Sequence, residues 1–272
     1  MMNLTRHEGA AGPRWALDGR WLAEDFTLTR LMQLPAAEMA GFLGAMAGPG
    51  AASGALLAPI EKDGEVWAAG VTYLRSREAR EAESTVRDVY SKVYDAARPE
   101  LFFKAPGWRV AGHGSPIRIR RDSRWNVPEP ELTLVVNVHG EIVGFCAGND
   151  VSSRDIEGEN PLYLPQAKCY DGSCALGPGI ALADAATLVD LSIDLVVLRA
   201  GRPIFTGATR TSQIKRPLQE LVDYLRRELT LPNGVFLMTG TGLVPPDDVS
   251  IEPGDQVRIT IGGLTLENPV ER

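Results

Sequence analysis

The 272-residue chain lacks the features of several protein classes. No uninterrupted apolar run approaches the roughly 20 residues that a membrane span requires, and residues 1–18 contain no apolar signal core. The net charge of -7 leaves no surplus of positive charge for binding nucleic acid or an anionic membrane. We therefore expect a cytoplasmic protein that binds neither, and an anionic substrate would need cations placed locally in its site.

Cysteine is scarce, with only Cys146, Cys169 and Cys174 in the whole chain. An odd number without the paired spacing of a zinc site indicates reduced thiols. The other fractions, 44% hydrophobic and 23% charged residues, are ordinary for a globular protein. A chain of this length holds one large core, or a core with a small extra domain.

The expected elements divide the chain into a short first part and a longer second part. The first part is expected to hold short strands, one helix and a Gly, Ala and Pro rich linker: strands at residues 15–21 and 28–34, the helix at 35–47 and the linker at 48–59. We therefore expect a small amino-terminal domain over residues 1–62 and a main domain over residues 63–272.

The second part alternates apolar runs with Gly and Pro, which is typical of a β-rich core. Two amphipathic helices are expected there, at residues 76–97 and 216–229. The apolar face of the first helix consists of Val86, Val89, Tyr90 and Val93. The runs that predict strands are residues 67–73, 102–103, 117–119, 132–138, 142–147, 193–198, 236–239 and 257–261.

Three acidic residues lie around one expected hairpin. Glu129 and Glu131 are two residues apart on a strand, so their side chains point to the same face. The two apolar runs that follow Glu131 flank a Gly-containing turn, which predicts a β-hairpin. A turn centred on residues 139–140 places Asp150 opposite Glu129, and a turn centred on residues 140–141 places it opposite Glu131.

In either register the three carboxylates converge. Directly opposed residues have Cβ atoms only about 4.5 to 5.5 Å apart, where like charges are destabilising unless something neutralises them. A hard dication would do so, which predicts a site for Mg²⁺, with Mn²⁺ or Ca²⁺ as alternatives. The opposing interpretation is a pair of solvated acids at a strand edge. Lys168, in a loop bounded by Pro and Gly after the acids, favours a site.

The chain also carries a set of short motifs in a fixed order. They are Glu129-Pro130-Glu131-Leu132, Asn149-Asp150-Val151-Ser152-Ser153-Arg154-Asp155, Lys168, Thr239-Gly240-Thr241-Gly242 and Glu252-Pro253-Gly254-Asp255. As a set, over residues 66–271, they resemble the fumarylacetoacetate hydrolase family. The resemblance implies an α+β fold with a mixed, bent β-roll core, a Mg²⁺ or Mn²⁺ ion, a homodimer or homotetramer, and small 2-oxo acids as substrates.

The same resemblance assigns roles to individual residues. It implies that Glu129, Glu131 and Asp150 are the metal ligands and that Lys168 is the active-site lysine. It also implies that Thr241 is the loop threonine near the substrate carboxylate.

One segment departs from the hydrolytic members of the family. Those members usually carry Gly-x-Asn-Tyr-x-x-His, in which the His helps to activate the attacking water. Here residues 70–76 read Gly-Val-Thr-Tyr-Leu-Arg-Ser, so Ser76 stands in place of that His. Because a group poised near neutral pH is then missing, the segment argues against carbon-carbon bond hydrolysis.

Residues 73–77 and 99–104 resemble one branch of the family, the 2-keto-3-deoxy-D-arabinonate dehydratases of oxidative pentose breakdown. This resemblance implies that a metal ion acidifies the C3 protons of a 2-keto-3-deoxy sugar acid. Lys168 would take one proton as the base and Glu100 would protonate the departing C4 hydroxyl, or the two roles are reversed. The expected substrate contacts are Arg75, Ser76, Asp171 and Thr241.

Two other classes of function stay open. The first is a hydrolase or decarboxylase of another 2-oxo acid, such as an acylpyruvate, a diketo-deoxy sugar acid or oxaloacetate. The second is a β-rich binding module in which the acids are only structural. Release of pyruvate would indicate the hydrolase, and metal-dependent thermal stabilisation without turnover would indicate the binding module.

Overall fold

The computed structural model describes residues 1–83 and 92–272, and strands account for most of its regular structure. The strands are β1 (Asn3–Gly9), β2 (Gly12–Leu17), β3 (Arg20–Leu22), β4 (Ala47–Ala51), β5 (Leu56–Leu57), β6 (Glu65–Gly70), β7 (Glu100–Pro106), β8 (Ile117–Arg118), β9 (Asn126–Val127), β10 (Pro130–Val136), β11 (Ile142–Asp150), β12 (Ser152–Ser153), β13 (Cys174–Leu182), β14 (Ser192–Arg199), β15 (Arg202–Arg210), β16 (Val235–Met238), β17 (Gln256–Ile261) and β18 (Leu264–Glu271). The helices are α1 (Leu28–Met32), α2 (Ala36–Ala45), α3 (Leu74–Glu83), α5 (Arg154–Glu159), α6 (Leu164–Lys168) and α7 (Leu218–Arg226).

These strands form three sheets. The largest has eleven strands in the order β4-β3-β2-β1-β13-β11-β10-β16-β6-β7, with β5 paired to β1. A five-stranded sheet has the order β15-β14-β17-β18-β8, and β12 pairs with β9. Most pairings are antiparallel, but β16 with β6 and β18 with β8 are parallel. These mixed sheets with few helices confirm the α+β expectation.

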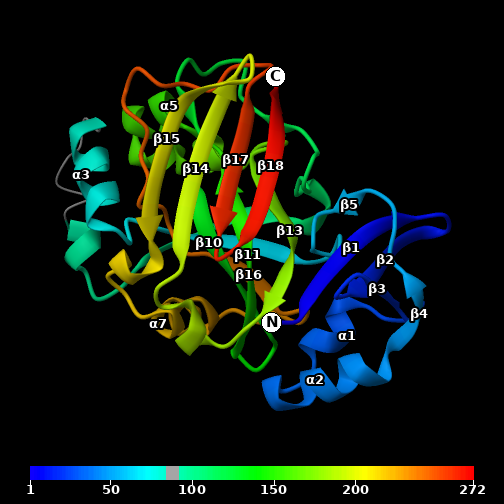
Figure 1. The fold of residues 1–272 in the computed structure, drawn as a ribbon. Helices are drawn as coiled ribbons and strands as arrows, with labels where there is room; N and C mark the ends of the chain where they lie inside the picture. Colours follow the sequence, from blue (N-terminus) through cyan, green and yellow to red (C-terminus); the bar gives the residue numbers. More distant parts are fainter. Residues whose placement is uncertain (84–91) are drawn as a thin grey trace.

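The two larger sheets pack against each other around one of two hydrophobic cores (Figure 1). Leu132 and Leu134 of β10 meet residues such as Leu195 of β14 and Ile259 of β17 in this core. Successive side chains of a strand point to opposite faces, so Val135 packs in the second core, with α1 and α2. Glu131 has the same parity as Val135, so it lies on the face away from the five-stranded sheet.

The amino-terminal part differs from the sequence expectation at residues 28–34. They were expected as a strand, but they contain helix α1, because two side chains satisfy the free amides of its first turn. Thr27 Oγ1 accepts from Arg30 N at 3.2 Å, and Glu61 accepts from Leu28 N at 2.7 Å and from Thr29 N at 3.1 Å. Glu61 lies far along the chain, so local sequence could not reveal this cap.

Two further segments of this part also differ. Residues 15–21 contain a turn at Asp18 and Gly19, both at positive φ, and form the β2–β3 hairpin instead of one strand. The expected linker at 48–59 contains strands, since β4 pairs with β3 and β5 pairs with β1. Because β1 also pairs with β13, the large sheet continues into the main part. The domain division after residue 62 stays a prediction.

In the main part, α7 confirms the helix expected at residues 216–229, and α3 confirms the first part of the helix expected at residues 76–97. Helix α3 starts two residues before the predicted start at Ser76, while Val86, Val89 and Tyr90 lie outside the described residues. Helix α7 lies within 216–229 and buries Leu221, Val222 and Leu225. Strands β13, β15 and β18 were not expected from the sequence. Among residues 1–83 and 92–272, no helix has the length and apolar character needed to cross a membrane.

The β10–β11 hairpin has the first of the two expected registers. Pro130 pairs with Asn149, and Asp150 N donates to Glu129 O at 2.9 Å, so Asp150 lies opposite Glu129. Next to the turn the register shifts by one residue, where Val136 pairs with Ile142. This bulge leaves Val143 without a partner on β10. The open end of the hairpin therefore brings the acids together.

Candidate active site

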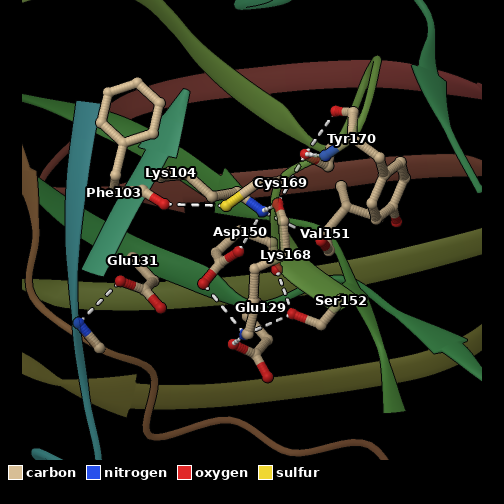
Figure 2. A network of polar contacts seen from close by, with 12 residues as sticks. Phe103, Lys104, Glu129, Glu131, Asp150, Val151, Ser152, Lys168, Cys169 and Tyr170 are labelled. Carbon is tan, nitrogen blue, oxygen red and sulfur yellow. Dashed lines mark hydrogen bonds and ion pairs between the residues drawn. The ribbon is translucent and has the colours of Figure 1, made fainter. Parts of the chain in front are cut away.

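The three acids meet on one face of the hairpin and are almost fully buried. Glu129 and Glu131 are 2% exposed and Asp150 is 1% exposed. One carboxylate oxygen from each lies within 4.8 Å of the others. Pro130 holds the strand extended between the two glutamates, and β11 ends at Asp150. The cluster is therefore a preformed group of oxygen donors inside the protein (Figure 2).

Three basic side chains contact these acids. Lys168 Nζ donates to Glu129 Oε2 at 2.6 Å and to Asp150 Oδ2 at 3.0 Å. Lys104 Nζ lies 2.5 Å from Asp150 Oδ1, and Arg154 Nη2 lies 2.9 Å from Glu129 Oε1. All three are at most 1% exposed. Glu129 and Asp150 are thus each contacted by two cations.

The three cations add to the sequence expectation, in which a dication neutralises the acids. Lys104, Lys168 and Arg154 already pair with two of the three carboxylates, Glu129 and Asp150. Glu157 Oε2 lies 4.0 Å from Arg154 Nη1 and adds a fourth carboxylate. None of these three cations forms an ion pair with Glu131, so a bound cation is still favoured beside that carboxyl group.

Glu131 differs from the other two acids because no described residue forms an ion pair with it. Its Oε2 accepts only from the backbone amide of Gly240, at 2.7 Å. Burial, followed by the nearby charges of Asp150 and Glu129, raises the pKa of Glu131 well above its usual value. Glu131 therefore has the most to gain from an added positive charge.

The donor set fits Mg²⁺. Carboxylate oxygens are the ligands that this hard cation prefers, and one or two of them commonly suffice beside water and substrate oxygens. Glu131, with one oxygen committed to Gly240, is the best-placed ligand, and Glu129 and Asp150 border the same space. These three residues would hold the ion.

Comparison with protein-family models gives the family. The model described as fumarylacetoacetate (FAA) hydrolase, C-terminal, matches residues 65–271. The chain belongs to the fumarylacetoacetate hydrolase family. Residues 129, 131, 150 and 168 all lie inside the matched range.

Three similar members of this family are named as dehydratases. The chain is 50% identical over 214 residues to the probable 2-keto-3-deoxyxylonate dehydratase of Haloferax volcanii, covering 78% of this chain and 73% of that protein. It is 44% identical over 214 residues to the 2-dehydro-3-deoxy-D-arabinonate dehydratase of Saccharolobus solfataricus, covering 76% and 72%. A solved 2-keto-3-deoxy-D-arabinonate dehydratase, complexed with magnesium and 2,5-dioxopentanoate, has a TM-score of 0.85 at 35% identity and covers 99% of both chains.

Thr241 and Ser76, two of the expected substrate contacts, are buried. Thr241 follows Gly240, whose amide binds Glu131, and is 4% exposed. Ser76 lies in the first turn of α3 and is 5% exposed. Their substrate contacts stay predictions for this family member.

Arg75, Asp171 and Glu100 lie in more open positions. The Arg75 side chain is exposed. The Asp171 side chain is 73% exposed and lies 3.2 Å from Arg109 Nε, whereas Lys168 contacts Glu129, Asp150 and Ser152. Glu100 begins β7 and packs so closely on Gly70 that a Cβ added there would lie 1.9 Å from Glu100 Oε2. The roles of these residues also stay predictions.

Sequence reasoning missed Lys104 entirely. The available signal was a single lysine inside the apolar run of residues 101–105, which is unusual for a buried strand. Arg154 and Asp155, which are neighbours in the second motif, contact different parts of the structure. Arg154 contacts Glu129, but Asp155 accepts from Ser123 Oγ at 2.6 Å and Arg124 N at 2.8 Å. Asp155 therefore fixes the neighbouring loop.

Proposed function

We propose that this protein is a Mg²⁺-dependent hydro-lyase that converts a 2-keto-3-deoxy-pentonate into 2,5-dioxopentanoate. The observation that carries the proposal is the buried cluster of Glu129, Glu131 and Asp150 with Lys168 directly on it. The dehydratase relatives, aligned over about three quarters of this chain, support the same substrate class.

The reaction needs a proton removed from C3 and a hydroxide lost from C4. Mg²⁺, when bound, supplies Lewis acidity for the carboxylate and C2 carbonyl oxygens of the substrate. Lys168 is buried on the acid cluster and, in its neutral amine form, takes the C3 proton. Glu100 donates a proton to the C4 hydroxyl, which leaves as water, or the two residues exchange these roles. The C3–C4 alkene then tautomerises to place the aldehyde at C5.

The remaining expected residues hold the substrate. Arg75 and Ser76 hold the hydroxyls or the carboxylate of the sugar acid, Thr241 lies near its carboxylate, and Asp171 contacts its tail. The same proposal includes a cytoplasmic location and assembly as a homodimer or homotetramer. It also includes no nucleic-acid partner and no membrane partner.

Hydrolysis of another 2-oxo acid is the second candidate. Ser76 occupies the position of the histidine in the hydrolytic motif, so the segment provides no imidazole to activate water. A hydrolytic product therefore serves as an outcome of the test.

The test is a screen of 2-keto-3-deoxy sugar acids with Mg²⁺ or Mn²⁺, in which 2,5-dioxopentanoate and pyruvate are both measured. We expect dioxopentanoate to form, chelator to stop it, and added Mg²⁺ to restore it. Lys168→Met and Glu131→Gln should abolish turnover, while the exposed control Lys62→Met keeps it. Chelator-resistant activity, or pyruvate as the product, would contradict the proposal.

A further inference from the structure

Lys104 is fully buried, yet the proposed reaction gives it no role. Its side chain is 0% exposed, and lysine is almost never found in this state without partners. It lies at a bulge of β7, because Val66 pairs with Ala105 while Trp67 pairs with Phe103. The extra residue of a bulge is left out of the ladder, and bulges often redirect a side chain beside a functional site.

The ammonium group of Lys104 joins three parts of the site. It lies 2.5 Å from Asp150 Oδ1 and donates to Val151 O at 3.2 Å and to Lys168 O at 2.5 Å (Figure 2). An ammonium group has three N–H groups, and three oxygens surround this one. It therefore retains no proton directed at a substrate, and any effect on catalysis must pass through Asp150 and Lys168.

The two oxygens of Asp150 are divided between two lysines. Lys104 holds Oδ1, and Lys168 contacts Oδ2. The same Lys104 ammonium binds the backbone carbonyl of Lys168, which fixes the end of α6 where the Lys168 side chain begins. The Lys104 ammonium group thus fixes both the rotation of the Asp150 carboxylate and the backbone position of Lys168.

We propose that Lys104 is a positioning residue that orients Asp150 toward the metal ion and anchors Lys168 beside it. This inference rests on the proposed function for its catalytic consequence, but its effect on Mg²⁺ binding requires no substrate. Without Lys104, Asp150 Oδ1 loses its cation and the Val151 and Lys168 carbonyls lose a donor. The carboxylate is then free to turn toward Lys168.

The first test is Mg²⁺ titration of Lys104→Met by calorimetry, with Lys62→Met as the control that removes an exposed lysine. Loss of the Lys104 charge alone would tighten Mg²⁺ binding, so weaker binding reports the lost orientation of Asp150. We expect Lys104→Met to weaken Mg²⁺ binding at least tenfold and Lys62→Met to leave it unchanged. A purely structural lysine would lower the melting temperature without changing the Mg²⁺ affinity. Wild-type affinity in Lys104→Met would therefore overturn the proposal.

The second test is a double-mutant cycle on metal-free stability, with Lys104→Met, Asp150→Asn and both together, measured by urea unfolding. If Lys104 acts through Asp150, the double variant is more stable than the sum of the single effects predicts, because neither charge is left alone. Additive losses overturn the proposal. If Lys104→Met alone does not fold, a folded double variant supports the proposal and an unfolded one refutes it.

These readouts separate the inference from the reaction. Should the wild-type protein turn over no 2-keto-3-deoxy sugar acid while Lys104→Met still loses Mg²⁺ affinity, the proposed function fails and the positioning role stands. Should turnover be normal in Lys104→Met, the positioning role fails and the proposed function stands.

Discussion

Glu131→Gln and Glu129→Gln are the same chemical change two residues apart on one face of the hairpin, but we expect opposite effects on the metal-free protein. Glu131 forms no ion pair in the described structure, and its pKa is raised by burial, so the metal-free fold disfavours its charge. Replacing it with a neutral amide of the same size should leave the metal-free stability unchanged or higher.

Glu129 is held by Lys168 at 2.6 Å and Arg154 at 2.9 Å. Neutralising it leaves two buried cations short of a partner, and breaking a buried pair in this way costs about 3–5 kcal/mol. A chain of 272 residues has an unfolding entropy of about 0.6 kcal/mol/K, so 1 kcal/mol corresponds to about 2 °C. Glu129→Gln should therefore melt about 6–10 °C lower than the wild type.

The Mg²⁺-induced shift in melting temperature tests Glu131 as a metal ligand. At 100 times its dissociation constant, a ligand that binds only the folded state adds about 2.7 kcal/mol. That gain is an upward shift of about 5 °C for the wild-type protein. We expect no such shift for Glu131→Gln, because its best-placed ligand is gone.

Differential scanning fluorimetry of both variants, with chelator and with saturating Mg²⁺, measures all four values. The reasoning is refuted if metal-free Glu131→Gln loses as much stability as Glu129→Gln. It is also refuted if Glu131→Gln keeps the wild-type Mg²⁺ shift.

Three further changes test other parts of the structure. Gly70→Ala places a methyl group where Glu100 Oε2 lies, so kcat should fall at least tenfold while the Mg²⁺-dependent melting shift persists, and an unchanged kcat would count against Glu100. Glu61→Ala removes the acceptor for two amides of α1 and should cost about 1–2 kcal/mol in urea unfolding, with Lys62→Ala as the control. Gly41→Ala, in the exposed interior of α2 with nothing near the new methyl group, should stabilise the protein by about 0.5–1 kcal/mol, and a loss of stability would show that α2 is not a regular helix there.

The acid cluster could be predicted from the sequence because its geometry is local. Glu129, Glu131 and Asp150 belong to one hairpin, so the two-residue period of a strand and a turn near residues 139–141 predict that they meet at its open end. Only the choice between two registers needed the structure. The bulge at Val143 sets this register, because the turn-side pair Val136–Ile142, continued without a bulge, would place Asp150 opposite Pro128.

The cations around the cluster could not be predicted in the same way. Lys104 lies on β7, which is joined to β10 through the pairings β7–β6, β6–β16 and β16–β10. A bulge in β7 turns the Lys104 side chain inward. Helix α1 depends on Glu61, more than 30 residues after the helix begins. Both features depend on pairings between distant segments, which hydrophobic periodicity does not encode.

The amino-terminal part contacts the hairpin that carries the acids. At the closed end of that hairpin, Asn137 Nδ2 donates to Leu34 O at 2.9 Å, and Glu141 Oε2 accepts from Ala36 N at 2.8 Å, the first residue of α2. At the open end, Lys104 and Lys168 hold Asp150. Both ends of β10 and β11 are therefore fixed by segments outside the hairpin. Since a ligand set must stay within about 0.5 Å of its working geometry, we expect loss of the contacts at the closed end to weaken metal binding.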